Sequence, residues 1–179
     1  MKSGSVSRLG FFHSILMLSG CGTVPLVVEP TVDPASTGSF EVQENRYRNT
    51  RFGYALQVPD GAILYALTPE QTAVAADEDA DVVFLVDGET NFFTVRGVED
   101  SRTPHEWLTQ NLSFFYPTGD AAQMVGEFAG TQAIFLQGSG TATSPARLIV
   151  LSTGEKLIII SYEQDTALFE SLVGSFSLL

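Results

Sequence analysis

The chain has 179 residues, of which 9 are Lys or Arg and 21 are Asp or Glu, so its formal net charge is −12. This length corresponds to one domain, and a hydrophobic fraction of 44% suffices for an ordinary core, which excludes disorder of the whole chain. The negative charge argues against binding to nucleic-acid phosphates. One cysteine and two histidines leave little material for a disulfide, a zinc site or cysteine catalysis.

The N-terminal residues have the pattern of a secretory signal peptide. Lys2 and Arg8 precede the mostly apolar segment 9–18, which is about half the length of a membrane-spanning helix. The segment ends at Leu18-Ser19-Gly20-Cys21, which resembles the lipoprotein box of bacterial lipoproteins. This resemblance implies that residues 1–20 are removed and that Cys21 carries the lipid (palmitate and other acyl chains). The alternative is a cysteine that merely follows an ordinary signal peptide.

A lipid on Cys21 would anchor the protein to the membrane from outside the cytoplasm, because two or three acyl chains bind a bilayer stably. Gly22 follows the cysteine, and by analogy with lipoproteins it is no inner-membrane retention signal. We therefore expect the outer membrane if the cell has two membranes. Residues 21–44 contain three prolines and many Ser and Thr residues, and they predict a flexible tether. The alternative for Val24–Val28 is an edge strand that docks on the domain.

From about Asn45 to residue 179 the pattern predicts a single domain of about eight short strands. Alternating apolar residues, separated by turn residues, are typical of strands joined by hairpins. The predicted strands are 52–58, 62–68, 82–86, 92–95, 123–128, 131–137, 147–151 and 156–162. Because hairpins pair strands antiparallel, we expect an antiparallel sheet.

Two segments predict helices that cover this sheet. Thr103 and Glu106 form a capping box with Pro104 at the first helical position, and the helix should extend to about Leu112. Asp165 is expected to cap a second helix, in which Leu168, Phe169, Leu172 and Val173 share one apolar face. The predicted fold class is therefore α+β, with an antiparallel sheet of about six to eight strands packed between helices.

Three motifs in this order resemble PsbP/DcrB-like domains over about residues 46–178. They are the segment 52–59 (FGYALQVP), Gly130-Thr131-Gln132-Ala133, and Tyr162 followed by an acid-capped helix and Ser175-Phe176. Ala62 stands where that family often has an aromatic residue. The resemblance implies an α/β/α sandwich. It implies little about activity, since relatives include photosystem assembly or oxygen-evolving subunits and bacterial lipoproteins.

Catalytic patterns are sparse in the sequence. His105 is the only histidine after the leader, and it lies at a predicted helix start, where the helix dipole disfavours its charged form. No G-x-S-x-G elbow occurs. We therefore expect a protein that is not an enzyme and needs no cofactor. A cell-wall hydrolase that uses carboxylates such as Glu99, Asp100 and Glu106 remains an alternative.

An acidic run offers a second alternative, a calcium or small-ligand site. Asp77, Asp79 and Asp81 occupy positions 1, 3 and 5 of a calcium-loop template. The template then requires Gly at position 6 and Glu at position 12, where this chain has Val82 and Gly88. An EF-hand is thus excluded, and the run is either a looser calcium site or a solvated acidic loop.

The aromatic run Phe114-Phe115-Tyr116 follows the first predicted helix. It either fills the core before a turn or forms a partly exposed patch for a protein partner, since aromatic residues are enriched at interfaces. Taken together, the sequence predicts a membrane-anchored extracytoplasmic lipoprotein that acts as a non-enzymatic binding or assembly module for an envelope component. Its expected partners are the membrane, through the lipid, and an envelope protein, and no nucleic acid.

Overall fold

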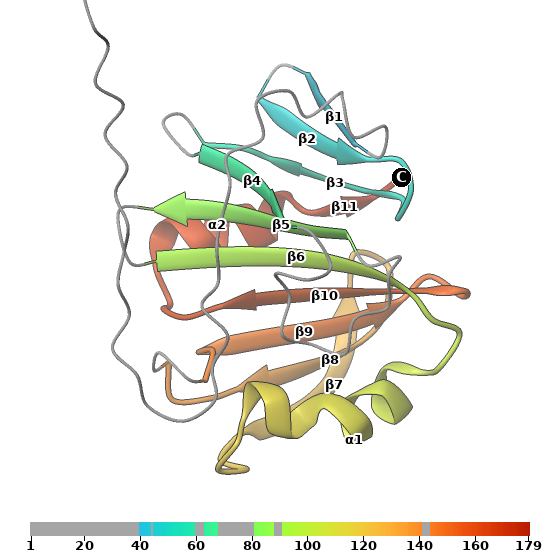
Figure 1. Ribbon diagram of the computed structural model, residues 1–179, viewed down its shortest axis with the longest axis vertical. Coiled ribbons are helices and arrows are strands. Elements are labelled where there is room, and N and C mark those ends of the chain that lie inside the picture. Colours follow the sequence, from blue (N-terminus) through green and yellow to red (C-terminus); the bar gives the residue numbers. More distant parts are fainter. Residues whose placement is uncertain (1–39, 44, 60–62, 68–80, 88–90, 141–143) are drawn as a thin grey trace, which may run out of the picture.

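The described part of the chain combines two helices with two antiparallel sheets, which is the expected α+β class (Figure 1). The computed structural model describes residues 40–43, 45–59, 63–67, 81–87, 91–140 and 144–179. The strands before the first helix are β1 (Phe40–Gln43), β2 (Arg46–Asn49), β3 (Tyr54–Gln57), β4 (Ile63–Leu67), β5 (Asp81–Asp87) and β6 (Asn91–Glu99). The elements that follow are α1 (Pro104–Phe115), β7 (Ala122–Phe128), β8 (Thr131–Gln137), β9 (Arg147–Ser152), β10 (Lys156–Tyr162), α2 (Ala167–Ser175) and β11 (Ser177–Leu178).

The larger sheet has seven strands in the order β4-β5-β6-β10-β9-β8-β7. The predicted hairpins β5–β6, β7–β8 and β9–β10 are all present and antiparallel. Ala129 and Gly130 connect β7 to β8 with φ angles of 50° and 80°, which is the two-residue turn that matches the twist of paired strands. Only the pairing of β6 with β10 joins strands distant in the sequence at the centre of this sheet, and local patterns do not predict it.

The smaller sheet has the order β1-β2-β3-β11 and departs from the sequence predictions at three places, the first of which is β2, which is not among the predicted strands. β1 lies within residues 21–44, which the sequence predicts as a tether, and it is held there by backbone pairing with β2. The sequence predicts Phe52 to be a strand residue, but it lies in the turn between β2 and β3, where Gly53 has a φ of 71°. The reason is that Asn49 Oδ1 accepts a hydrogen bond from the Phe52 backbone N–H and closes the turn.

Two hydrophobic clusters lie on opposite faces of the larger sheet. Along β10, Ile158 and Ile160 belong to the cluster that includes α2 and the smaller sheet, while Leu157 and Ile159 belong to the cluster under α1. The alternation follows from the period of two in a strand. α1 contacts β8 and β9, and α2 contacts β3. Because both faces of β9 and β10 are buried, these strands are continuous apolar runs rather than alternating ones.

Both predicted helices are present, with one corrected cap. Thr103 and Glu106 form the expected capping box of α1, which ends at Phe115, later than predicted. The cap of α2 is Thr166, whose side chain accepts a hydrogen bond from the Phe169 N–H, and not Asp165. Asp165 instead pairs with Arg147 at 2.9 Å. Within the described residues, neither helix has the length and apolar character needed to cross a membrane.

Candidate functional site

The predicted lipid and calcium residues fall mostly beyond the part of the chain that the structure describes. Cys21, Asp77 and Asp79 lie outside the described residues. Asp81 is the first residue of β5, where its backbone pairs with Gly97 of β6. Among the described residues, no group of three or more His, Cys, Asp or Glu side chains is arranged to hold a metal ion.

The aromatic run at the end of α1 divides between core and surface. Phe115 is 9% exposed and Tyr116 is 2% exposed, and both belong to the cluster under α1. The Tyr116 ring lies against Gly138, where a Cβ would come within 2.2 Å of Tyr116 Cε1. Phe114 is 45% exposed and contacts the Phe115 ring edge to face at 5.1 Å. Phe115 and Tyr116 therefore fill the core, and Phe114 is exposed at the surface.

Exposed apolar side chains occur on α1 and on β7, the edge strand of the larger sheet. Met124 and Val125 of β7 are 64% and 58% exposed. Together with Phe114 they make up three of the four large hydrophobic side chains that are exposed in the described part of the chain. We call these three residues the Phe114 surface.

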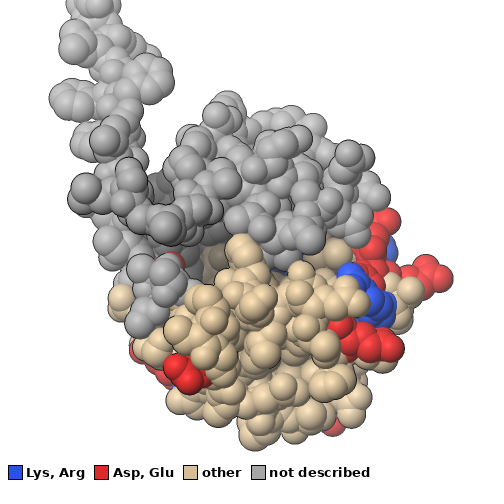
Figure 2. Space-filling view, turned by 60° about the horizontal axis from the view of Figure 1, so that its bottom comes forward, with Lys and Arg blue, Asp and Glu red and all other residues tan. Residues whose placement is uncertain are grey.

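The Phe114 surface lies in a stretch that is almost free of charge. Residues 107–126 contain a single ionisable charge, Asp120, in a chain with 30 acidic and basic residues. Figure 2 turns the α1 end of the molecule forward and shows broad uncharged surface there, with the basic side chains and many acidic ones at the right margin and a few acidic ones at the left and lower edges. Covering a charged surface requires the removal of water from its charged groups, which costs free energy. In this acidic protein, the cost is lowest at an uncharged face such as this one.

β7 presents both of its faces because it is the outer strand of the larger sheet. Val125 lies opposite Ile134 on the α1 side, and Met124 lies opposite Phe135 on the α2 side. The sequence analysis identified the strand but not its exposure. An alternating pattern of apolar residues is the same in an edge strand and in a half-covered inner strand. Only the order of the strands in the sheet therefore shows that β7 is exposed.

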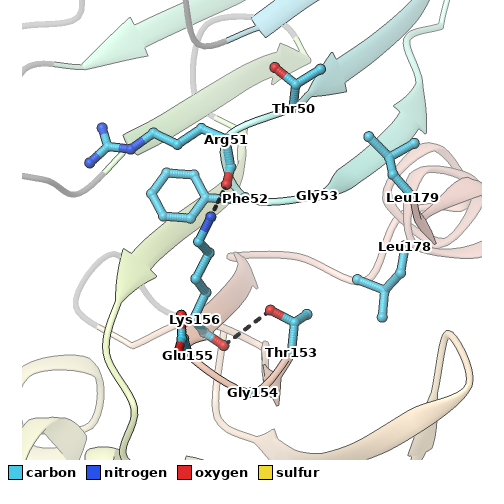
Figure 3. A pocket seen from close by; sticks show the side chains of 10 residues that line it. All are labelled: Thr50, Arg51, Phe52, Gly53, Thr153, Gly154, Glu155, Lys156, Leu178 and Leu179. Carbon is cyan, nitrogen blue, oxygen red and sulfur yellow. Dashed lines mark hydrogen bonds between the residues drawn. The ribbon is translucent and has the colours of Figure 1, made fainter.

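A separate hollow of about 500 Å³ lies between the smaller sheet and the β9–β10 turn (Figure 3). Arg51 and Lys156 stand over the Phe52 ring, with Arg51 Cζ at 5.0 Å and Lys156 Nζ at 5.8 Å from its centroid. Lys156 Nζ also donates to the Arg51 carbonyl, and Arg51 Nε lies 3.2 Å from Glu99 Oε1. Both cations therefore stabilise the turn that carries Phe52. The charged residues of the hollow thus have a structural role.

Two acids near the start of α1, Asp100 and Glu106, are both stabilised as carboxylates. Side-chain hydrogen bonds from Arg102 lower the pKa of Asp100, with Arg102 Nε at 2.9 Å from both carboxylate oxygens. Hydrogen bonds from the Thr103 backbone and hydroxyl lower the pKa of Glu106. Each carboxylate is therefore held in its charged form, whereas a general acid requires a raised pKa.

Arg96 is a charged residue within the larger sheet. It lies opposite Ile159 of β10 and Val82 of β5, and burial lowers its pKa to about 10. No acidic side chain in the described ranges forms an ion pair with it, and its Nε is enclosed without a hydrogen-bond partner there. A buried N–H group that lacks a hydrogen-bond partner reduces stability.

Comparison of the chain with protein-family models, with curated proteins and with solved structures finds no match in any of the three.

Replacement of Tyr116 by Phe is expected to raise the free energy of unfolding at pH 7 by up to about 1 kcal/mol, because the buried Tyr116 hydroxyl has no hydrogen-bond partner among the described residues. Burial raises the pKa of Tyr116 to about 12, above its value near 10 in the unfolded chain. The wild type should therefore lose about 2 to 3 kcal/mol as the pH rises from about 10 to 12, and the variant should lose less.

Urea unfolding at a series of pH values, followed by Trp107 fluorescence, measures both effects. Tyr47→Phe is the control, since the Tyr47 hydroxyl accepts a hydrogen bond from Asn49 Nδ2 at 3.3 Å and its removal should be destabilising. An unchanged alkaline profile for Tyr116→Phe would contradict the expectation.

Proposed function

We propose that this protein is an extracytoplasmic lipoprotein, anchored to the membrane through Cys21, whose domain is a non-enzymatic binding or assembly module for an envelope protein. The observation that carries the proposal is the Phe114 surface, three exposed apolar side chains on α1 and β7 within an almost uncharged stretch of an acidic chain. Interface cores are depleted in charge and enriched in aromatic residues and Met, and this surface has that composition.

The location is supported by the leader and by the charge of the remaining chain. After residues 1–20 and their two basic residues are removed, the chain has 7 basic and 21 acidic residues and a net charge of −14. Anionic head groups repel such a domain, so attachment depends on the lipid. A flexible tether of residues 22–39, which ends where β1 begins, would reach roughly 23 Å and hold the domain away from the bilayer.

The arrangement of the helices supports a PsbP/DcrB-like α/β/α sandwich as part of this proposal. α1 and α2 pack against clusters on opposite faces of the seven-stranded sheet. The family motifs fall in elements that build these clusters, with Phe52 and Tyr54 in the first motif and Tyr162 and Phe176 in the last. A module of this kind binds through its surface, and Phe114 is an exposed aromatic residue in the last turn of α1.

Substitution of Phe114 by Asp tests the docking role. A carboxylate at the centre of an apolar interface must be desolvated without a partner, so we expect the variant to weaken partner binding by about tenfold or more. The measurement is cross-linking in intact cells from a photoreactive residue at position 125, with the cross-linked partner identified by mass spectrometry. The yield of that one adduct is compared between chains with and without the Phe114→Asp substitution.

Gln164→Asp is the matched control, because Gln164 is exposed between β10 and α2 and the substitution adds the same charge away from the Phe114 surface. The control should keep the wild-type yield. An equal loss in both variants, or no loss in either, would refute a docking role for Phe114. Phe114→Asp should unfold at nearly the wild-type urea concentration, since the side chain is 45% exposed.

A further inference from the structure

Within the described residues, the β7 edge of the larger sheet offers backbone groups in a regular row that pair with no other strand. The hairpin that joins β7 to β8 closes at the pair Phe128 and Thr131 with a two-residue turn, so this pair exchanges backbone hydrogen bonds. Hydrogen-bonded and non-hydrogen-bonded pairs alternate along an antiparallel ladder. The N–H and C=O groups of Gln123, Val125 and Glu127 therefore point away from β8, toward the free edge.

The sequence of β7 is complementary to itself when two copies are paired antiparallel about Val125. This register sets Val125 opposite its own copy, Gln123 opposite Glu127, Met124 opposite Gly126 and Ala122 opposite Phe128. The three residues whose backbone groups point outward then face one another, so all six of their N–H groups find a carbonyl. Each large side chain on the α2 side meets a small one, which lets the side chains of the two strands interlock.

Charge also favours this register. Two copies of a protein with a net charge of −12 repel each other, and a close approach is least unfavourable where each copy has few charges. Glu127 is the only charged residue in β7, and its partner in this register is the amide of Gln123, which can donate to it. If the register shifted by two residues in one direction, Glu127 would lie opposite Val125. If it shifted by four residues, Glu127 would lie opposite Glu127 of the second copy, and the two carboxylates would repel each other.

We propose that β7 pairs with β7 of a second copy of this chain in the register centred on Val125, so that the two larger sheets continue into one. The pairing is two-fold symmetric and uses the same edge of both copies, so it closes at a dimer. It covers an edge that would otherwise attract other strands. This pairing rests on the proposed function, because it treats the Phe114 surface as a docking surface. It adds that a second copy of the chain occupies the β7 edge.

Single cysteines test the register in the full-length protein in its own membrane. In the proposed dimer the two Val125 residues are a hydrogen-bonded pair with Cα atoms about 5.5 Å apart, within the range for a disulfide. Val125→Cys should therefore form a disulfide-linked dimer when copper phenanthroline oxidises the two thiols. Gln123→Cys is the matched control on the same exposed strand, because its two copies would lie about 14 Å apart. The wild-type chain controls for Cys21.

A reducible dimer of Val125→Cys, about tenfold more abundant than that of Gln123→Cys, supports the register. A dimer of Gln123→Cys in equal or greater yield overturns it. If neither variant cross-links, β7 does not pair with a second copy, and the inference falls. The proposed function would still stand in that case if the photoreactive residue yields an adduct with a different protein that Phe114→Asp removes, so the two failures are distinguishable.

A second variant tests the pairing without oxidation. Val125→Lys places two ammonium groups opposite each other at the symmetry axis, and lysine on an edge strand blocks strand addition. We expect the dimer dissociation constant, measured by sedimentation of the detergent-solubilised protein, to rise by about tenfold or more. Gln164→Lys, with the same charge at an exposed site outside β7, should leave it unchanged. Equal dissociation constants for both variants would overturn the pairing.

Discussion

Substitution of Gly97 by Ala is expected to lower the free energy of unfolding by about 3 kcal/mol, the largest effect of a single methyl group that we predict in this protein. A Cβ at position 97 of β6 would lie 2.1 Å from Cγ of Phe52 and 2.3 and 2.4 Å from its two Cδ atoms. The clash is with the rigid base of the ring, so the ring cannot avoid it by moving its tip. The Phe52 turn must shift away from β6 or β6 must bend.

The size of the effect follows from the position of Phe52. The ring is 1% exposed and belongs to the cluster that joins the smaller sheet and α2 to the larger sheet. Arg51 and Lys156 cover its outer face. Displacing the ring therefore exposes apolar surface and separates these cations from it. Urea unfolding followed by Trp107 fluorescence measures the loss.

Two further variants make the Gly97 test specific. Gly174→Ala in α2 adds a methyl group where no atom lies within 4 Å, and it should stabilise the protein by up to about 1 kcal/mol because Ala favours the helix. Phe52→Ala removes the ring and should cost about 3 to 5 kcal/mol alone. In the Phe52→Ala background, Gly97→Ala should then cost less than about 1 kcal/mol. Additive losses in the double variant would show that the ring contact is not the cause.

Substitution of Cys21 by Ala is expected to abolish lipid attachment. The thiol is the only group in the lipoprotein box that can carry the acyl-bearing adduct, so labelled palmitate incorporation should fall to background. The precursor should also keep residues 1–20, because cleavage depends on prior lipidation in proteins with this box. Mass spectrometry of the purified protein and palmitate labelling, with and without globomycin, measure both effects.

Gly22→Ala is the control for the Cys21 experiment, since it changes the adjacent residue and leaves the thiol in place. It should be lipidated and cleaved like the wild type. A wild-type protein that begins at Met1, carries no lipid and fractionates like Cys21→Ala would refute the anchor.

Local patterns were sufficient for the hairpins and the helices. The period of two in 131–137 and 156–162, the Ala129-Gly130 turn and the Thr103 capping box all involve residues close in the chain, and β7 to β10 and α1 appear where they were predicted. The cap of α2 was misplaced by one residue because Asp165 and Thr166 are both good caps. The ion pair of Asp165 with Arg147, which engages Asp165 elsewhere, joins residues distant in sequence.

By itself, the sequence determined the α+β class, the hairpin pairs, the capped helices and the leader pattern, because each depends on neighbours along the chain. Tertiary structure decided the rest. It brought β11 back to β3, where Arg46 Nη2 reaches Ser177 Oγ at 2.9 Å across 131 residues, and it seated Phe52 on Gly97. It also placed β7 at an edge, buried Tyr116 and left Phe114 exposed. Whether an apolar side chain is covered depends on which distant strand or helix packs over it, and local periodicity carries no information about that partner.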